Sequence, residues 1–243
     1  GILVAGAGAG WALAADAATF AVAAFCFHAI DVPAVRDPDA AAATSMLADL
    51  GAGFAEVMRH TWLWLLIGQA LLYHLFYGGA QGVLGPIVVR DSLGMAAWGW
   101  ALGALMAGFM LGGVVSLRWR PRHGLFAGTA LLALTAAFPL AMALSDQLPV
   151  LLLGAVLHGF GLELFSVNWD LSIQQNIGPD KLARVYSFDI VGSFVARPLG
   201  LALTGPVATL VGFDRWLLVV AAVMAGSSLL ALLSPDVRRL VRR

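Results

Sequence analysis

Long apolar stretches, separated by short polar ones, make up most of this chain. Four segments contain no aspartate, glutamate, lysine or arginine: 60–89, 92–117, 123–145 and 216–235. A helix needs about 20 mostly apolar residues to cross a bilayer, so stretches of this length predict membrane-spanning helices. We expect seven of them in an all-α membrane bundle, at 8–30, 62–83, 95–117, 124–144, 149–171, 185–211 and 214–233.

The longest polar stretch, 31–61, lies between the first two predicted spans. It begins with turn sequence rich in proline and aspartate, and a helical repeat of apolar residues follows: Leu47, Leu50, Phe54, Val57 and Met58. This pattern predicts a short amphipathic helix. The helix lies either on the membrane surface or against the base of the bundle.

Glycines and prolines cluster in two of the predicted spans. They are Gly78, Gly79, Gly82, Gly85 and Pro86 near the end of the second span, and Gly192, Pro198, Gly200, Gly205 and Pro206 in the sixth. Small residues let helix backbones approach closely, and proline interrupts the backbone hydrogen-bond ladder. We therefore expect close helix contacts and bends in both spans.

Composition agrees with a polytopic membrane protein. Hydrophobic residues make up 60% of the 243 positions and charged residues 12%, about half the charged fraction of a soluble domain. The single cysteine, Cys26, excludes a disulfide framework, and no Cys/His spacing suits zinc. Nucleotide-binding loops and hydrolase motifs are lacking too, so we expect no metal, no cofactor and no enzyme activity. Lipid is an expected partner and nucleic acid is not.

The placement of the basic residues predicts orientation. Most of the 14 fall in alternate connections, at 31–61, 118–123, 172–184 and after 234, whereas the opposite connections hold only Arg90 and Arg215. Cytoplasmic loops of membrane proteins carry such an excess of lysine and arginine. The chain is therefore expected in the cell membrane with a cytoplasmic C-terminus, and seven spans then place the start of the first span outside.

Two loop motifs resemble the major facilitator superfamily of transporters. The first is Gly112-Gly113 with Arg118-x-Arg120-Pro121-Arg122, similar to the second copy of that family's glycine- and arginine-rich loop. The second runs from Gln175 through Pro179 and Arg184 to Asp189, followed by Pro198-Leu199-Gly200, and looks like the bacterial efflux-type members that export macrolides and siderophores. The pattern departs from that group at Ala183, where a glycine often precedes the loop arginine.

The resemblance implies that the chain corresponds to helices six to twelve of a twelve-helix carrier. Residues 1–30 would then be the last helix of an N-terminal half, 31–61 a cytoplasmic linker, 62–233 the six-helix C-terminal half and 234–243 a basic cytoplasmic tail. The first residue lies inside an apolar segment, so we expect a fragment whose missing partner is the first five helices. Such carriers work by alternating access, with small molecules and protons as partners.

Ionisable groups inside apolar spans are expensive and usually functional. Glu163, within the run 148–171, is either a proton site or counter-charge for a substrate, or a structural carboxylate. Asp170 suggests a gate or a structural pair with Arg118 or Arg184, and Asp189 a coupling, gating or structural group. Arg197 would bind an anionic substrate or, more safely, pair with Glu163 or Asp189. Asp16 would face the missing half.

Neutral polar residues in the spans are candidates for a substrate cavity. Gln69, Tyr73 and His74 lie in the second span, and Gln69 and Tyr73, four residues apart, share a helix face. Helix–helix hydrogen bonding is the alternative role for all three. His158 and Asn168 are each five residues from Glu163 and so do not share its face. A single histidine in an apolar helix is more often a satisfied core group than a functional one.

These observations favour a secondary transporter that exports small hydrophobic compounds in exchange for protons. Glu163 and Asp189 would be the first coupling candidates. The alternative is a seven-span receptor or scaffold without transport activity. The only lysine, Lys181, lies in a predicted loop, so a retinal-type receptor with a lysine inside a span is disfavoured.

Overall fold

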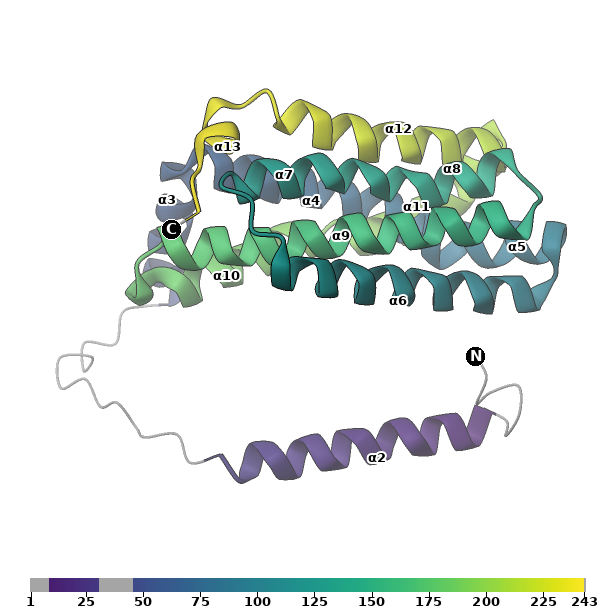
Figure 1. Ribbon diagram of the computed structural model, residues 1–243, viewed down its shortest axis with the longest axis horizontal. Helices are drawn as coiled ribbons and strands as arrows, with labels where there is room; N and C mark the ends of the chain where they lie inside the picture. The colour runs from purple at the N-terminus through teal and green to yellow at the C-terminus, as the bar shows by residue number, and fades with distance from the viewer. Residues whose placement is uncertain (1–8, 31–45, 243) are drawn as a thin grey trace. The chain divides into compact units, whose positions relative to one another are not determined.

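A computed structural model describes residues 9–30 and 46–242 as parts of two compact units, 1–46 and 47–243 (Figure 1). All regular structure in these residues is helical and none is strand, as the apolar pattern predicts. The first unit contains α2 (Ala9–His28). The described residues contain six helices long and apolar enough to cross a membrane, where seven were predicted.

The six long helices all belong to the second unit. They are α4, η2 and α5 in one continuous run (Thr61–Gly79, Ala80–Leu84, Gly85–Leu93); α6 (Met95–Arg118); α7, η3 and α8 (Gly124–Leu132, Ala133–Ala136, Ala137–Leu144); α9 (Leu148–Asn176); α10 and α11 (Pro179–Phe194, Arg197–Val211); and α12 (Phe213–Ala231). Two short helices, α3 (Met46–Arg59) and α13 (Pro235–Arg239), precede and follow them.

Several helices extend beyond the predicted spans. The second runs on to Leu93, because polar residues such as Arg90 and Asp91 continue the helix and form an ion pair at its end. It stops at Gly94, which has a φ of 88°. Glycine adopts such a positive φ with little strain because it has no Cβ. The predicted loop 172–184 is wrong for the same reason: α9 continues to Asn176, and α10 already begins at Pro179.

Breaks occur where the sequence predicts bends. A π-helical turn, Ala80–Leu84, leads into Gly85 and Pro86 of α5. In the sixth span, α10 ends at Phe194 and α11 begins at Arg197, with Pro198 in its first turn. Proline has no N–H to donate and its ring clashes with the preceding turn, so the helix cannot run straight through this point.

Glycines bring α6 and α9 into backbone contact. A Cβ on Gly108 would overlap the carbonyl oxygen of Val156, and a Cβ on Gly159 would overlap that of Leu105. The opposite side of α9 uses the same device, since a Cβ on Gly154 would lie 2.7 Å from the carbonyl oxygen of Ala137. Helix α9 is therefore packed between α6 and the α7–α8 run.

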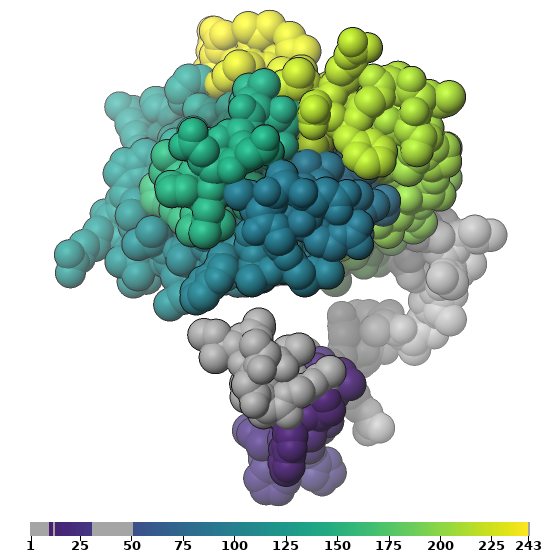
Figure 2. All heavy atoms as spheres, turned by 90° about the vertical axis from the view of Figure 1, so that its right-hand side faces the viewer, coloured from purple at the N-terminus to yellow at the C-terminus, as the bar shows by residue number. Residues whose placement is uncertain are grey.

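The predicted glycine contacts in the second and sixth spans are confirmed. A Cβ on Gly79 would overlap the Thr204 side chain, and a Cβ on Gly200 would overlap the backbone of Leu75. Helices α4 and α11 thus pack backbone to backbone. Figure 2 shows the second unit from the end where α5 meets α6, α8 meets α9 and α11 meets α12. Helices α11 and α12 are yellow-green in this view.

The predicted amphipathic helix is confirmed as α3, and it packs on the bundle. Val57 is buried with Trp62 and Val185, and the Phe54 ring lies 6.2 Å from that of Phe188. Glu56 receives a hydrogen bond of 2.9 Å from the Lys181 ammonium group at the start of α10. Of the two predicted positions for this helix, these contacts favour the base of the bundle.

Substitution of a packing glycine tests the contact between α6 and α9. Gly108→Ala should lower the thermal unfolding temperature in detergent, because the new methyl group meets rigid backbone of α9, at a cost of about 1–3 kcal/mol. The matched control is Gly103→Ala in the same helix, where nothing lies within 4 Å of the added Cβ. Equal unfolding temperatures for the two variants would contradict the packing described.

The contact of α3 with α10 should weaken in acid. The hydrogen bond from Lys181 is the largest influence and lowers the pKa of Glu56; burial opposes it, and the hydrogen bond from Arg59 lowers the pKa further. A carboxyl whose pKa is lowered on folding stabilises the fold above its usual pKa, and this stabilisation is lost as pH falls through the lowered value. The protection factors of the α3 amides, which are exchange rates corrected for the intrinsic effect of pH on amide exchange, should therefore fall between neutral pH and about pH 4.

The control for this acid effect is Glu56→Gln, which cannot titrate. Its α3 should exchange faster at neutral pH and lose most of the additional pH dependence. Asp214→Asn, at the start of α12, should behave like the parent chain. Unchanged pH dependence in Glu56→Gln would show that another group is responsible.

Candidate functional site: a polar cavity between α4, α9 and α10

A cavity of about 270 Å³ lies among the helices of the second unit. It is lined chiefly by α4, α9 and α10, with Phe109 from α6 and Leu132 from α7. The polar side chains around it are Gln69, Tyr73, His74, Ser166, Asp189 and Ser193. The apolar side chains include three leucines and four more aromatic residues, which are Phe109, Phe165, Trp169 and Phe194. An apolar pocket with a few polar groups is the usual form of a small-molecule site.

The cavity lies at the border of two clusters of buried side chains. Tyr73 belongs to the cluster that includes Phe138 and Met224. Leu66 and Trp169 belong to the other cluster. The cavity is the space between these two clusters that the side chains of neither cluster fill.

Asp189 supplies the only carboxylate among the described residues that line the cavity. The indole N–H of Trp169 donates to its Oδ2 at 2.9 Å, and the Ser193 hydroxyl donates to its Oδ1 at 3.2 Å. Ser193 is one helical turn after Asp189 on α10, whereas Trp169 reaches across from α9. Neutral donors therefore hold the half-buried carboxylate, and no described cation pairs with it.

Tyr73 is held by a hydrogen-bonded chain that ends in backbone. His158 Nδ1 lies 2.7 Å from the carbonyl oxygen of Thr135, which can only accept, so Nδ1 carries the proton. In the neutral ring Nε2 must then accept, and the Tyr73 hydroxyl donates to it at 2.8 Å. The His158 ring also stacks on Tyr77, with centroids 4.3 Å apart. Both ring nitrogens of His158 thus have hydrogen-bond partners. This agrees with the interpretation of His158 as a core histidine rather than a functional one.

The amide of Gln69 has one partner and one unpartnered oxygen. Its Nε2 donates to Ser228 Oγ at 3.4 Å, while the Ser228 hydroxyl donates to the carbonyl of Met224 at 2.8 Å. Because the Ser228 proton is already used, Ser228 can only accept from Gln69, which fixes the amide orientation. Gln69 Oε1 is buried and receives no hydrogen bond from any residue that the structure describes.

His74 completes the polar wall. Its Nδ1 donates to the carbonyl of Ala70 at 2.8 Å, one turn earlier on α4, and its ring lies 4.0 Å from that of Phe194. In the neutral imidazole this leaves Nε2 as an acceptor. The structure therefore brings four of the predicted residues to one cavity: Gln69, Tyr73, His74 and Asp189.

Two partners of Asp189 were missed in the sequence. Ser193 carries a signal, because a serine four residues after an aspartate shares its helix face. Trp169 carries none, since its contact with Asp189 depends on how α9 and α10 pack.

Other predicted residues lie elsewhere. Asn168 is buried against Gly124 and Gly128 of α7, where its Nδ2 donates to the carbonyl of Leu164, so it does not line the cavity. Glu163 is partly buried against Gly112 of α6. A Cβ added to Gly112 would lie 2.8 Å from the Cβ of Glu163. No described residue forms a hydrogen bond or ion pair with Glu163.

The predicted pairing of Arg197 is wrong. Neither Glu163 nor Asp189 lies within ion-pair distance of its guanidinium, which belongs to an exposed side chain packed over Gly78 of α4. The break before Pro198 starts a new helix at Arg197, so its direction does not follow from the helical register of Asp189. Asp170 is exposed and forms no ion pair with Arg118 or Arg184. Asp16 lies in α2, in the first unit.

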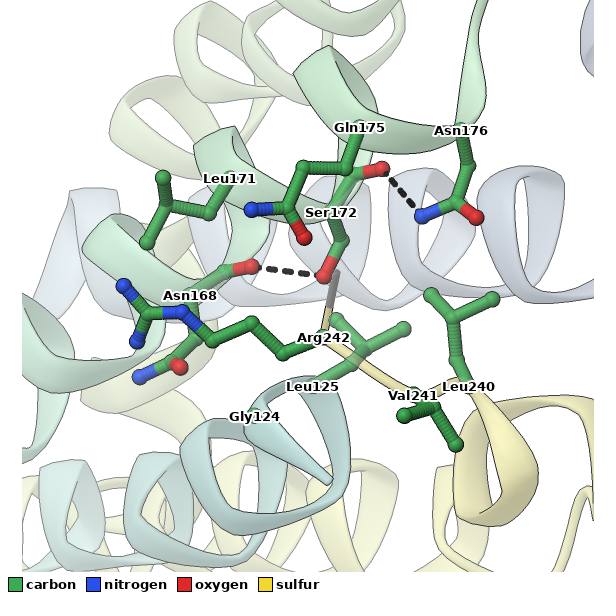
Figure 3. A pocket seen from close by; sticks show the side chains of 10 residues that line it. All are labelled: Gly124, Leu125, Asn168, Leu171, Ser172, Gln175, Asn176, Leu240, Val241 and Arg242. Atoms are coloured by element: carbon green, nitrogen blue, oxygen red, sulfur yellow. Dashed lines mark hydrogen bonds between the residues drawn. The ribbon is translucent and has the colours of Figure 1, made fainter. Parts of the chain in front are cut away.

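The loop-motif residues gather near one end of the second unit. Arg118 ends α6, Arg120 and Arg122 lie in the connection to α7, Pro179 begins α10, and Arg184 is in that helix beside Gly53 of α3. Gln175, near the end of α9, lines a small pocket with Asn168, Ser172 and the C-terminal residues 240–242 (Figure 3). The backbone N–H of Arg242 donates to the carbonyl of Arg122 at 2.9 Å.

The pocket in Figure 3 is too small for a substrate. Its volume is about 10 Å³, roughly the room that one water needs. The hydroxyl of Ser172 donates to the Asn168 carbonyl, and the Asn176 amide donates to the Ser172 carbonyl, so both of these side chains already have partners.

Comparison of the chain with protein-family models, with curated proteins and with solved structures found no match in any of the three. Within the described part of the chain, no three His, Cys, Asp or Glu side chains are grouped so that they could hold a metal ion. The cavity around Asp189 is therefore the candidate site on its geometry alone.

The hydrogen-bonded chain behind the cavity can be tested by a single hydroxyl deletion. Tyr73→Phe should destabilise the fold by roughly 1–3 kcal/mol, because it leaves His158 Nε2 buried without a donor. Thermal unfolding in detergent measures the loss.

The matched control is Tyr186→Phe, which removes a hydroxyl that only accepts an exposed hydrogen bond of 3.3 Å from Gln174. It should change stability by no more than about 0.5 kcal/mol. A Tyr73→Phe variant as stable as Tyr186→Phe would rule out the assigned chain of donors.

Proposed function

We propose that this chain is the C-terminal part of a secondary membrane transporter of the facilitator type, and that it moves small hydrophobic compounds in exchange for protons. The observation that carries the proposal is the cavity of about 270 Å³ that contains one carboxylate, Asp189, among helices long and apolar enough to cross a membrane. Ionisable groups at such positions commonly mark substrate or proton paths.

The surroundings of Asp189 suit a carboxylate that binds a proton and a cationic group in turn. The carboxylate is held by the neutral donors Trp169 and Ser193 rather than by a cation. A proton or a cationic group of a substrate can then bind to the free lone pairs without displacing an existing ion pair. In this proposal the two compete for Asp189, which couples their movements in opposite directions.

The two interrupted helices support alternating access. The π-turn Ala80–Leu84 follows the stretch of α4 that lines the cavity, and the break at 195–196 follows Ser193 and Phe194. Bends at such points let helix segments move while the packed segments keep their contacts. In this proposal both bends open and close the cavity.

Charge placement supports the proposed orientation in a cell membrane. Arg122 of the connection 119–123 and Arg242 of the C-terminal tail are neighbours, joined by a hydrogen bond between their backbones. We assign this end, with α3 and α13, to the cytoplasm because of its excess of basic residues.

The loop motifs support the facilitator-type assignment and the direction of transport. Gly112-Gly113 with Arg118, and Gln175 to Arg184, are the sequence features that resemble efflux-type members. The five helices that would complete a twelve-helix carrier are part of this proposal. A receptor or scaffold would use the same cavity for binding without moving its ligand.

Transport assays separate these functions. The chain, with any in-frame coding sequence that precedes Gly1, is reconstituted in liposomes that contain a pH-sensitive dye, and a panel of hydrophobic amines, alcohols and acids is added under an imposed proton gradient. A transported compound should release protons across the membrane. Asp189→Asn should reduce this coupled proton flux at least about tenfold, because the amide cannot exchange a proton.

The matched control is Asp214→Asn at the exposed start of α12, away from the cavity, which should retain the flux of the parent protein. Equal flux in the Asp189 and Asp214 variants would exclude Asp189 as the coupling group. Binding of panel compounds without any flux would instead identify a receptor.

A further inference from the structure

The polar groups around the cavity share one property: most of their donors are already used. Tyr73 donates to His158, His74 Nδ1 donates to the Ala70 carbonyl, and the Ser193 hydroxyl donates to Asp189. Trp169 likewise uses its only N–H on Asp189. Among the described hydroxyls that line the cavity, only that of Ser166 forms no hydrogen bond, and it can donate or accept.

The hydrogen-bonding capacity that remains on these groups is mainly that of acceptors. Asp189 keeps lone pairs on both oxygens, neutral His74 keeps Nε2, and the Tyr73 oxygen keeps a lone pair. Gln69 adds an unpartnered carbonyl oxygen, although its side chain is only 5% exposed. A buried acceptor without a donor is costly, so a ligand that supplies a donor there gains free energy on binding.

The remaining walls are aromatic or aliphatic. Trp169 and Phe165 stack with centroids 6.0 Å apart, and Phe194 lies against His74. Aromatic faces attract cations and pack well on flat apolar groups. No lysine or arginine is among the described lining residues, although the charge of Arg197, whose side chain is packed over Gly78, still acts on the lining residues Tyr73 and His74.

We propose that this cavity binds an organic ammonium ion, in which a cationic nitrogen with N–H groups carries an aromatic or aliphatic body. Asp189 is its counter-charge, Gln69 Oε1 takes one of its N–H groups, and the faces of Trp169 and Phe194 receive the body. This inference rests on the proposed carrier function and names the class of its substrate.

A matched ligand series tests the inference by calorimetry on the protein, with any in-frame coding sequence before Gly1, in a detergent without aminophospholipid. The series is naphthylethylamine, its N-trimethyl derivative, naphthylethanol and naphthylacetic acid, which share one aromatic body. The amine should bind roughly 10- to 100-fold more tightly than the alcohol, because its hydrogen bonds involve charged groups. The acid should not bind detectably, and the trimethyl derivative, which has no N–H, should be weaker than the amine.

Two variants assign the contacts. Asp189→Asn should lower the affinity for the amine about tenfold or more and leave that for the alcohol nearly unchanged, whereas the control Asp214→Asn should bind all four compounds like the parent. Gln69→Met should narrow the difference between the amine and its trimethyl derivative, since it removes the acceptor for N–H. Thermal unfolding of each variant shows whether it is folded.

The inference is overturned if the acid or the alcohol binds as tightly as the amine, or if Asp189→Asn binds the amine unchanged. Equal affinity for the amine and its trimethyl derivative would overturn the role of Gln69 and of the free acceptors. Displacement of the amine by phosphatidylethanolamine, but not by phosphatidylcholine, would identify a lipid head group as the source of the ammonium.

Failure of this inference can be told apart from failure of the carrier function. If the amine binds through Asp189 but is not moved across liposomes, the ligand class stands and the carrier function fails. If the acid or the alcohol is moved and the amine is not, the carrier function stands and the ligand class fails.

Discussion

The rest of the structure depends on the close approach of α9 to α6 and to the α7–α8 run. Between apolar helices in lipid there is little hydrophobic driving force, so association relies on dense packing and on backbone proximity. Gly108 and Gly159 provide this on one side of α9, and Gly154 on the other. With α9 fixed in this way, Phe165, Ser166 and Trp169 are presented together toward α4 and α10. The cavity is thus a consequence of glycine positions that themselves lie outside it.

Polar groups near the cavity show how a low-dielectric interior sorts hydrogen bonds. Several buried donors find an acceptor in a backbone carbonyl one turn away or on a facing helix, as those of His74, Ser228 and His158 do. Carbonyls and carboxylates can accept more than one hydrogen bond, so acceptor capacity remains when the donors have been used. Among the lining residues, Asp189 keeps such acceptor capacity on its carboxylate, and Gln69 keeps it on a buried carbonyl oxygen.

Much of the fold could be predicted from sequence, because span length and apolar pattern are local properties. The six long helices, the amphipathic α3, the break before Pro198 and the close contact at Gly79 all follow from such patterns. Helix ends were less accessible, since Arg90 and Asp91 continue a helix that hydropathy alone would stop. In the candidate site, Gln69 and Tyr73 share a face through their spacing. By contrast, the orientation of Arg197 and the bond from Trp169 to Asp189 depend on a helix break and on packing between helices.

The C-terminal residues have a mechanical consequence. Val237 in α13 is fully buried, α13 contacts both α4 and α7, and Arg242 is bonded to the connection that precedes α7. The tail therefore fastens α4 and α7 to each other at the end where α3 also packs. A change in the spacing of these two helices must then be largest at the opposite end, beyond the π-turn at Ala80–Leu84. The bundle is therefore expected to be stiffer at the end that carries α3 and α13 than at the end that carries α5.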